Sequence, residues 1–189
     1  MLKKLSTMAA IVGLSFSVTA ILTPNAFAQG APSGNETFYG EIGYAYVPFN
    51  SAGYNLGSFG IGLIRGGINI HKNFSAEALI GVGITDASFY VGSTLITTKI
   101  NNMYGFYAKP KFQVADNVEL FGRVGYTNVD VTASSRYGGV TGNSGSLSYG
   151  LGAQVDFNKS VYGQLDWMSY YGKNGDTGRG PSISVGVKF

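Results

Sequence analysis

The sequence predicts an all-β protein, an eight-stranded antiparallel up-and-down transmembrane β-barrel. Three observations lead to this prediction. Apolar residues recur two apart along most of the chain, the connections between these stretches alternate strictly between short and long, and the chain ends on an apolar stripe that closes with Phe189. Alternation with a period of two indicates β-strands rather than helices.

The first 28 residues predict export. Lys3 and Lys4 precede an apolar run of roughly 15 residues, and the small-residue pattern AFA follows and ends at Ala28. The run is short for a membrane-spanning helix, which needs about 20 apolar residues. We therefore expect residues 1–28 to be a Sec-type signal peptide cleaved after Ala28, and residues 29–189 to form a single β-barrel domain.

The composition narrows the class of protein further. Thirteen Lys and Arg stand against ten Asp and Glu, and two of these lysines belong to the expected signal peptide, so the processed chain is close to neutral. This balance does not support a nucleic-acid partner. Cysteine is absent, so no disulfide can stabilise the exported chain. Only 12% of the residues are charged, whereas soluble proteins carry about 25%.

Eight alternating stretches are the expected strands. In chain order they cover residues 36–47, 60–70, 74–85, 103–114, 118–129, 147–157, 160–170 and 180–189. One face of each stretch is apolar and rich in aromatic residues. In a β-sandwich this face would point inward, whereas in a membrane barrel it faces lipid, and segments of about ten residues with alternating hydrophobicity are typical of such barrels. Aromatic residues near the strand ends, expected at the membrane interfaces, are Tyr44, Tyr46, Tyr104, Tyr126 and Trp167.

The opposite face of the strands carries five acids and five bases, with glycine and glutamine between them. These charged residues are Glu41, Arg65, Glu77, Lys109, Lys111, Glu119, Arg123, Asp156, Asp166 and Lys188. An eight-stranded barrel is only wide enough for its own side chains, and an unpaired buried charge costs several kcal/mol. We interpret the charges as a mutually neutralising structural network, not a ligand site or an ion path. Arg65 and Glu77 are expected to pair, with Glu41, Lys109 and Arg123 joining further contacts.

The lengths of the connections predict the orientation of the barrel. HKN, ADN and NK are tight turns at residues 71–73, 115–117 and 158–159, whereas the other connections are long, at residues 48–58, 86–102, 130–145 and 171–180. Outer-membrane barrels have short periplasmic turns and long extracellular loops. Pro110 lies inside the fourth strand, and since proline removes a ladder hydrogen bond, we expect a bulge near the periplasmic rim or a shorter strand there.

Together with the export sequence, the strand count and the loop alternation, the ending SISVGVKF makes the chain similar to a known family. It resembles the small eight-stranded outer-membrane barrels of Gram-negative bacteria, of the OmpA-transmembrane-domain, OmpX and opacity-protein type. The resemblance implies location in the cell outer membrane, contact with outer-membrane lipid and lipopolysaccharide, and help from periplasmic chaperones. The stripe Ile183, Val185, Val187 and Phe189 resembles the signal that the barrel-assembly machinery recognises. A monomer is expected, because a closed barrel leaves no unpaired edge.

No catalytic, cofactor-binding or metal site is predicted. The single histidine, His71, lies in a short turn without a Ser or Asp partner at the opposite rim, and hydroxyl-rich segments without a general base are not activated nucleophiles. The absence of cysteine and of a histidine pair also leaves no metal motif.

The expected function therefore rests on the long connections, since binding residues are often carried by loops on a rigid scaffold. Possible surface contacts, with lipopolysaccharide phosphates or with host or phage ligands, are Arg136, Tyr137, Lys173 and Arg179. We expect an integral outer-membrane protein with a structural, adhesive or surface-recognition role and no catalysis. The alternatives are a narrow channel for small or hydrophobic solutes and, third, a lipid-modifying enzyme.

Overall fold

A computed structural model describes residues 38–51 and 53–189, and the expected signal peptide lies outside them. The described residues form nine β-strands, and none of them belongs to a helix long and apolar enough to cross a membrane. The strands are β1 (Phe38–Ser51), β2 (Tyr54–His71), β3 (Phe74–Thr85), β4 (Ala87–Val91), β5 (Thr94–Ala115), β6 (Val118–Ser135), β7 (Gly138–Asp156), β8 (Val161–Lys173) and β9 (Asp176–Lys188).

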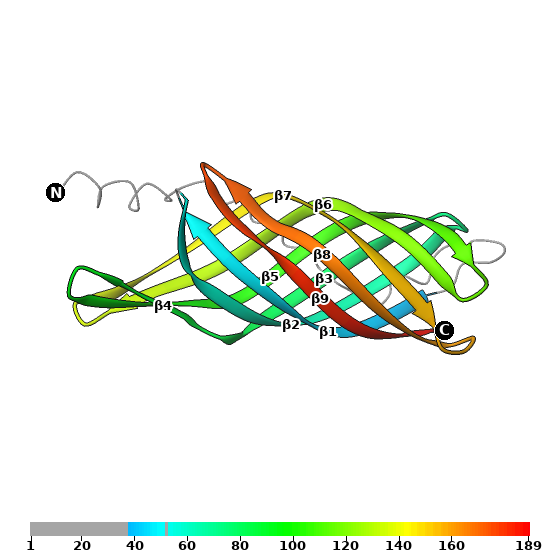
Figure 1. The fold of residues 1–189 in the computed structure, drawn as a ribbon, viewed down its shortest axis with the longest axis horizontal. Helices are drawn as coiled ribbons and strands as arrows, with labels where there is room; N and C mark the ends of the chain where they lie inside the picture. The colour runs from blue at the N-terminus through cyan, green and yellow to red at the C-terminus, as the bar shows by residue number, and fades with distance from the viewer. Residues whose placement is uncertain (1–37, 52) are drawn as a thin grey trace, which may run out of the picture.

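The strands close into a barrel in which neighbours in sequence are neighbours in space (Figure 1). Strands β3 and β4 follow one another with only Asp86 between them and both pair with β5, so the nine segments occupy eight positions. The first and last strands pair with each other, and the backbone N–H of Phe189 donates to the carbonyl oxygen of Phe38 at 2.9 Å. All ladders are antiparallel, which confirms the predicted eight-stranded up-and-down barrel.

The connections differ from the prediction at one end of the barrel. The three short turns lie where they were expected, at residues 72–73, 116–117 and 157–160. The four long connections were expected to be loops, and this is wrong for most of their length, because the strands continue through them as paired hairpins. The two longest of these segments, residues 86–102 and 130–145, contain many Thr, Val, Ile and Tyr residues, which favour strands. Residues with positive φ, such as Gly92 and Asn174, then close the hairpins in tight turns.

Pro110 is accommodated within a long strand. The expectation of a shorter fourth strand is wrong, since β5 is 22 residues long and passes through the proline. The β5–β6 ladder keeps the same register on both sides, at Ala108 and at Lys111, with a gap at the proline. A register shift does occur nearer the short turn, between Gln113 and Ala115. One missing N–H therefore interrupts the ladder locally without shifting it.

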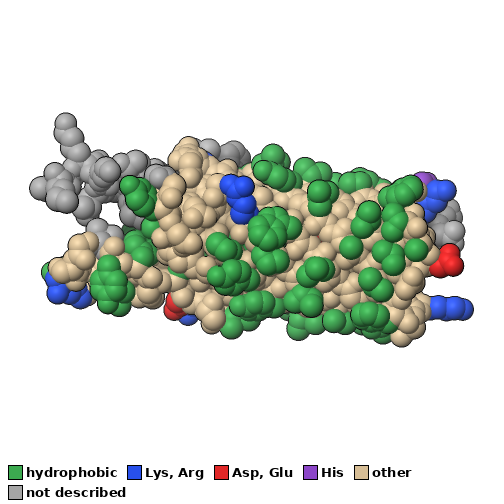
Figure 2. Space-filling model, in the orientation of Figure 1, with side chains coloured by type: hydrophobic (Ala, Val, Ile, Leu, Met, Phe, Trp, Pro, Cys, Tyr) green, Lys and Arg blue, Asp and Glu red, His purple; other side chains and the backbone are tan. Residues whose placement is uncertain are grey.

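The outer surface of the barrel is apolar and exposed, which is the reverse of a soluble protein. Ile42 is 70% exposed and Leu151 is 74% exposed, and Figure 2 shows hydrophobic side chains spread over the barrel wall, with charged ones mainly toward its two ends. Two aromatic girdles border this surface. Phenylalanines lie near the short turns, namely Phe38, Phe74, Phe112, Phe157 and Phe189, and mainly tyrosines lie further along, namely Tyr44, Tyr46, Tyr104, Tyr126, Tyr149 and Trp167.

The spacing of the girdles fits a membrane. Phe38 and Tyr46 lie eight residues apart on β1, which corresponds to about 20 Å along the barrel axis at a rise near 3.4 Å per residue and a tilt near 40°. The apolar band of outer-membrane barrels is roughly 25 Å tall. Lipid therefore covers the wall between the two girdles, and the hairpins extend beyond it.

Candidate functional site

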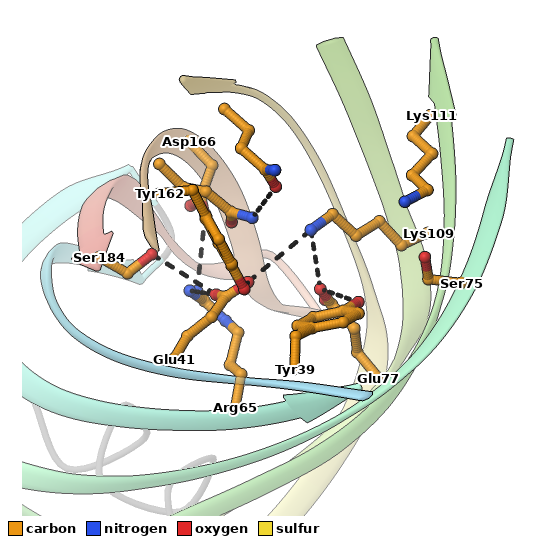
Figure 3. A network of polar contacts seen from close by, with 12 residues as sticks. Tyr39, Glu41, Arg65, Ser75, Glu77, Lys109, Lys111, Tyr162, Asp166 and Ser184 are labelled. Atoms are coloured by element: carbon orange, nitrogen blue, oxygen red, sulfur yellow. Dashed lines mark hydrogen bonds and ion pairs between the residues drawn. The ribbon is translucent and has the colours of Figure 1, made fainter. Parts of the chain in front are cut away.

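Three acids and three bases form a buried ionic layer inside the half of the barrel nearer the short turns (Figure 3). The members are Glu41, Arg65, Glu77, Lys109, Arg123 and Asp166, and each side chain is at most 2% exposed. They come from six strands, and each lies at an inward position of the period-two pattern. The layer is neutral as a whole, as burial of charge requires.

Arg123 is the centre of this ionic layer. Its Nε lies 2.5 Å from Glu77 Oε2 and its Nη1 lies 2.5 Å from Asp166 Oδ2. Its Nη2 donates to Gln164 Oε1 at 2.8 Å and lies 3.5 Å from Glu41 Oε2. A single guanidinium thus joins acids from β1, β3 and β8, and charge-assisted hydrogen bonds of this kind are stronger than neutral ones.

Arg65 and Lys109 complete the ionic layer. Arg65 contacts Glu41 at 3.4 Å and Asp166 at 3.6 Å, while Lys109 contacts Glu77 at 3.1 Å and Glu41 at 3.7 Å. The expected pair of Arg65 with Glu77 is not among these contacts.

The register explains this correction. Arg65 lies opposite Glu41 in the β1–β2 ladder, whereas in the β2–β3 ladder it lies opposite Leu79 and Glu77 lies opposite Gly67. Arg65 therefore pairs with the acid of the other neighbouring strand.

The remaining predicted lumen charges form two pairs at the rim. Lys111 Nζ lies 3.5 Å from Glu119 Oε2, and Lys188 Nζ lies 2.8 Å from Asp156 Oδ2. Their side chains are 13–30% exposed, so water screens these pairs more than the ionic layer.

Two tyrosines that the sequence analysis did not assign to the lumen support the ionic layer. Tyr39 Oη donates to Glu77 at 2.8 Å, and Tyr162 Oη donates to Glu41 at 3.0 Å. Each ring lies over a glycine directly opposite on the neighbouring strand, Gly67 for Tyr39 and Gly186 for Tyr162, where a Cβ would come within 2.2 Å of the ring. A tyrosine facing a glycine across the ladder is a sequence signal that could have identified both.

The lumen beyond the ionic layer, toward the long hairpins, is filled by an apolar layer that the sequence analysis missed. It comprises Ala45, Val47, Phe59, Ile61, Leu63, Leu79, Ala87, Ile100, Met103, Tyr107, Val129, Met168 and Tyr170, each at most 9% exposed. The sequence of β2 does indicate this layer, because Ile61 and Leu63 are apolar on the inward face while Ile64 is apolar on the outward face. Both faces of the strand are therefore apolar at this height.

Among the described residues the side chains of the two layers occupy most of the lumen. A cavity at the short-turn mouth, lined by Lys109, Lys111, Lys188 and four neighbours, has a volume of about 10 Å³. Such a volume accepts about one water molecule. The lumen is therefore packed with side chains, as the width of an eight-stranded barrel predicts.

Two hairpins project beyond the others at the opposite end of the barrel (Figure 1). Strands β4, β5, β6 and β7 pair there in a four-stranded sheet, which we name the projecting sheet, with Ala87↔Thr98 and Thr97↔Ser134 among its partners. Among the described residues no strand pairs with the outer edge of β4 or with β7 before Tyr149. Ala87 packs against Gly57 of β2, and Ser146 Oγ accepts a hydrogen bond from the backbone N–H of Gly172, so the edges are open beyond Ala87 on β4 and before Ser146 on β7. Open edges are surfaces to which another chain can add.

The predicted surface residues lie on two different hairpins. Arg136 and Tyr137 form the turn between β6 and β7, with the guanidinium 4.7 Å from the centre of the ring, and Tyr137 is 77% exposed. Lys173 and Arg179 lie on the β8–β9 hairpin. The structure thus exposes all four without bringing them into one site.

The C-terminal stripe lies on the outer wall of the barrel. Ile183, Val185, Val187 and Phe189 are 61, 49, 47 and 75% exposed. The first three face β1 across the last ladder, so the stripe covers the seam that closes the barrel.

No metal-binding cluster is found among the described residues. His71 is exposed at the end of β2, where its Nδ1 accepts a hydrogen bond from the backbone N–H of Asn73 at 3.3 Å. No three His, Cys, Asp or Glu side chains in the part of the chain that the structure describes are placed to hold a metal ion.

Fold and lumen together define the class of protein, a closed transmembrane β-barrel whose interior is filled by its own side chains. The chain belongs to the family described as Outer membrane protein beta-barrel domain, which matches residues 14–189. No curated protein matches it significantly in sequence.

Solved structures of other proteins share the fold at low identity. Ail, the attachment invasion locus protein of Yersinia pestis, is similar with a TM-score of 0.64 and 18% identity over 82% of this chain and all of Ail, in a structure that contains the heparin analogue sucrose octasulfate. Neisserial surface protein A is similar with a TM-score of 0.61 and 15% identity, over 82% of this chain and all of that protein. The N-terminal β-barrel domain of Pseudomonas aeruginosa OprF is similar with a TM-score of 0.55 and 13% identity, over 80% of this chain and 97% of that domain.

Proposed function

We propose that this protein is a non-catalytic surface-recognition protein, in which a sealed barrel anchored in the outer membrane carries the projecting sheet on the outside of the cell. The observation that carries the proposal is this sheet, which extends past the lipid-covered wall with two open strand edges. Exposed aromatic residues, Tyr90 at 72% and Tyr137 at 77%, lie near its tips, and large amphipathic side chains are frequent anchors in protein interfaces.

The filled lumen favours this function over transport. A channel requires a continuous polar path, but the apolar layer occupies most of the lumen, the buried hydroxyls of Thr127 and Ser148 beside it are bound to Tyr107, and the ionic layer is internally neutralised. Purified protein in planar bilayers is expected to give no reproducible single-channel steps. Regular conductance steps would favour the channel instead.

The open edges also suggest how a ligand would bind. An extended peptide can pair with an exposed edge through main-chain hydrogen bonds, and the β7 edge at residues 138–145 contains no proline and no charged side chain that would block it. Ail was crystallised with a heparin analogue. A sulfated sugar is therefore a suitable second probe beside immobilised extracellular-matrix proteins.

The test compares the full chain with a variant that lacks the tips of the projecting sheet, residues 88–97 and 134–139. Both are expressed in a non-adherent Gram-negative strain, and binding of the cells to matrix proteins and to heparin-coated surfaces is measured. A variant shortened only at the β8–β9 turn is the matched control. We expect the first deletion to abolish binding while the protein remains folded and heat-modifiable on a gel; equal binding by all three forms would contradict the proposal.

A further inference from the structure

The outward face of the projecting sheet changes chemistry sharply at the tyrosine girdle. Below Tyr104 and Tyr126 the strands present aliphatic and aromatic side chains to lipid. Above them the same face consists mainly of hydroxyls and carboxamides up to the level of Ser88, Thr97 and Ser134, and we name this part the polar face. Its residues are Ser88, Thr97, Lys99, Asn101, Asn102, Asn128, Asp130, Thr132, Ser134, Thr141 and Asn143. Beyond it, at the tip of the β4–β5 hairpin, Tyr90 and Leu95 lie on the same side.

Side chains of the polar face are linked to one another across three strands. Asn101 Nδ2 donates to Thr132 Oγ1 at 2.8 Å, and Thr132 Oγ1 lies 2.8 Å from Thr141 Oγ1. Ser88 Oγ and Thr97 Oγ1 lie 3.1 Å apart on the neighbouring hairpin. Asn101 and Thr141 are exposed at the ends of this chain of hydrogen bonds. The groups are thus held in place while donors and acceptors stay open to a partner.

The polar face differs from an ordinary water-facing surface in its charge. Solvated surfaces are normally about 25–35% charged, whereas this face carries one base and one acid, Lys99 and Asp130, among eleven residues. The other side of the same sheet is apolar, with Ile96, Ala133 and Val140. A neutral surface that offers both donors and acceptors matches a polyhydroxylated partner better than a phosphate or a charged peptide.

We infer that the polar face binds the sugars of the glycolipid that surrounds the barrel in the outer leaflet. The position of the polar face identifies this partner. The face begins where the lipid-covered wall ends and lies on the same side of the same strands. The sugar portion of a neighbouring lipid therefore lies against it. From Tyr126 to Ser134 the face extends for eight residues, about 20 Å in height. The inference rests on location in the outer membrane and not on the proposed recognition of external ligands.

The experiment uses the full folded chain in nanodiscs with two lipopolysaccharides that share one lipid A and differ only in the presence of core sugars. Hydrogen–deuterium exchange is measured at the backbone amides of residues 97–102 and 128–134. With core sugars we expect exchange there to slow about threefold or more, the effect of roughly one net hydrogen bond. Amides of the β8–β9 hairpin are expected to be unaffected.

Variants assign this protection to the polar face. Replacing Asn101→Ala, Thr132→Val and Thr141→Val together is expected to remove the sugar-dependent difference, whereas Thr132→Ser alone keeps it. The control changes two residues on the other side of the sheet, Thr98→Val and Val140→Thr, and is expected to keep the difference.

Three outcomes would overturn the inference. These are equal exchange with both lipopolysaccharides, protection that survives the triple replacement, and protection lost equally in the control. Arg179→Gln tests contact with phosphate, which both lipopolysaccharides carry, and is expected to leave the sugar-dependent difference unchanged. Failure of the cell-binding assay leaves this prediction intact, so the two proposals fail separately.

Discussion

Replacing Arg123 with methionine tests the ionic layer most directly. The side chain is fully buried and contacts Glu77 and Asp166, both at 2.5 Å. Its loss leaves three acids against two bases, with Lys109 still 3.1 Å from Glu77 and Arg65 still 3.6 Å from Asp166. Removal of one partner from a buried ion pair costs about 3–5 kcal/mol, because a charge remains uncompensated. We expect the free energy of unfolding to fall by about that amount.

The assay is equilibrium unfolding by urea in lipid vesicles, followed by the fluorescence of Trp167, the single tryptophan, and by heat-modifiability. The matched control is Lys188→Met at the rim, whose pair with Asp156 is 26–30% exposed and is expected to contribute about 0–1 kcal/mol.

Neutrality of the ionic layer can be restored in a second variant. Adding Glu77→Gln to Arg123→Met leaves two acids and two bases, and we expect it to recover a large part of the loss. Two results would contradict this role of the ionic layer. One is that Arg123→Met lowers the free energy of unfolding by no more than Lys188→Met does. The other is that adding Glu77→Gln to Arg123→Met lowers the free energy of unfolding further, as an independent second loss would.

Three further changes test the wall, the lumen and the closing seam. Ile42→Arg on the lipid face is expected to destabilise the barrel by about 2–4 kcal/mol, whereas Val140→Arg on the projecting sheet changes stability little; equal effects in urea unfolding would argue against the membrane boundary. Gly186→Ala meets the ring of Tyr162 and is expected to cost about 1–3 kcal/mol through overpacking, and an unchanged unfolding midpoint would contradict this packing. Deletion of Phe189 is expected to lower the folded, heat-modifiable fraction in outer membranes, while the wild-type fraction would show that the final residue is dispensable for assembly.

The sequence alone was enough to predict the architecture, because two of its patterns are local. Alternation assigned Ile42 to the lipid side and Glu41 to the lumen without any knowledge of the partners, since successive side chains of a strand point to opposite faces. The short turns fixed which strands are neighbours. The four long connections were misjudged, because Gly, Ser and Asn in them suggested loops while their Thr, Val and Tyr residues form paired hairpins.

Only the tertiary structure decided which lumen charges meet. Alternation places a residue on a face but gives no height along the barrel, which depends on the register of every ladder and on strand tilt. Glu77 and Asp166 lie 46 and 43 residues from Arg123 in the chain, yet both contact its guanidinium across the lumen. The apolar layer needed the tertiary structure for the same reason: alternation places Leu63 and Met103 on the inward face, but they become a layer only when the closed barrel brings them to a similar height.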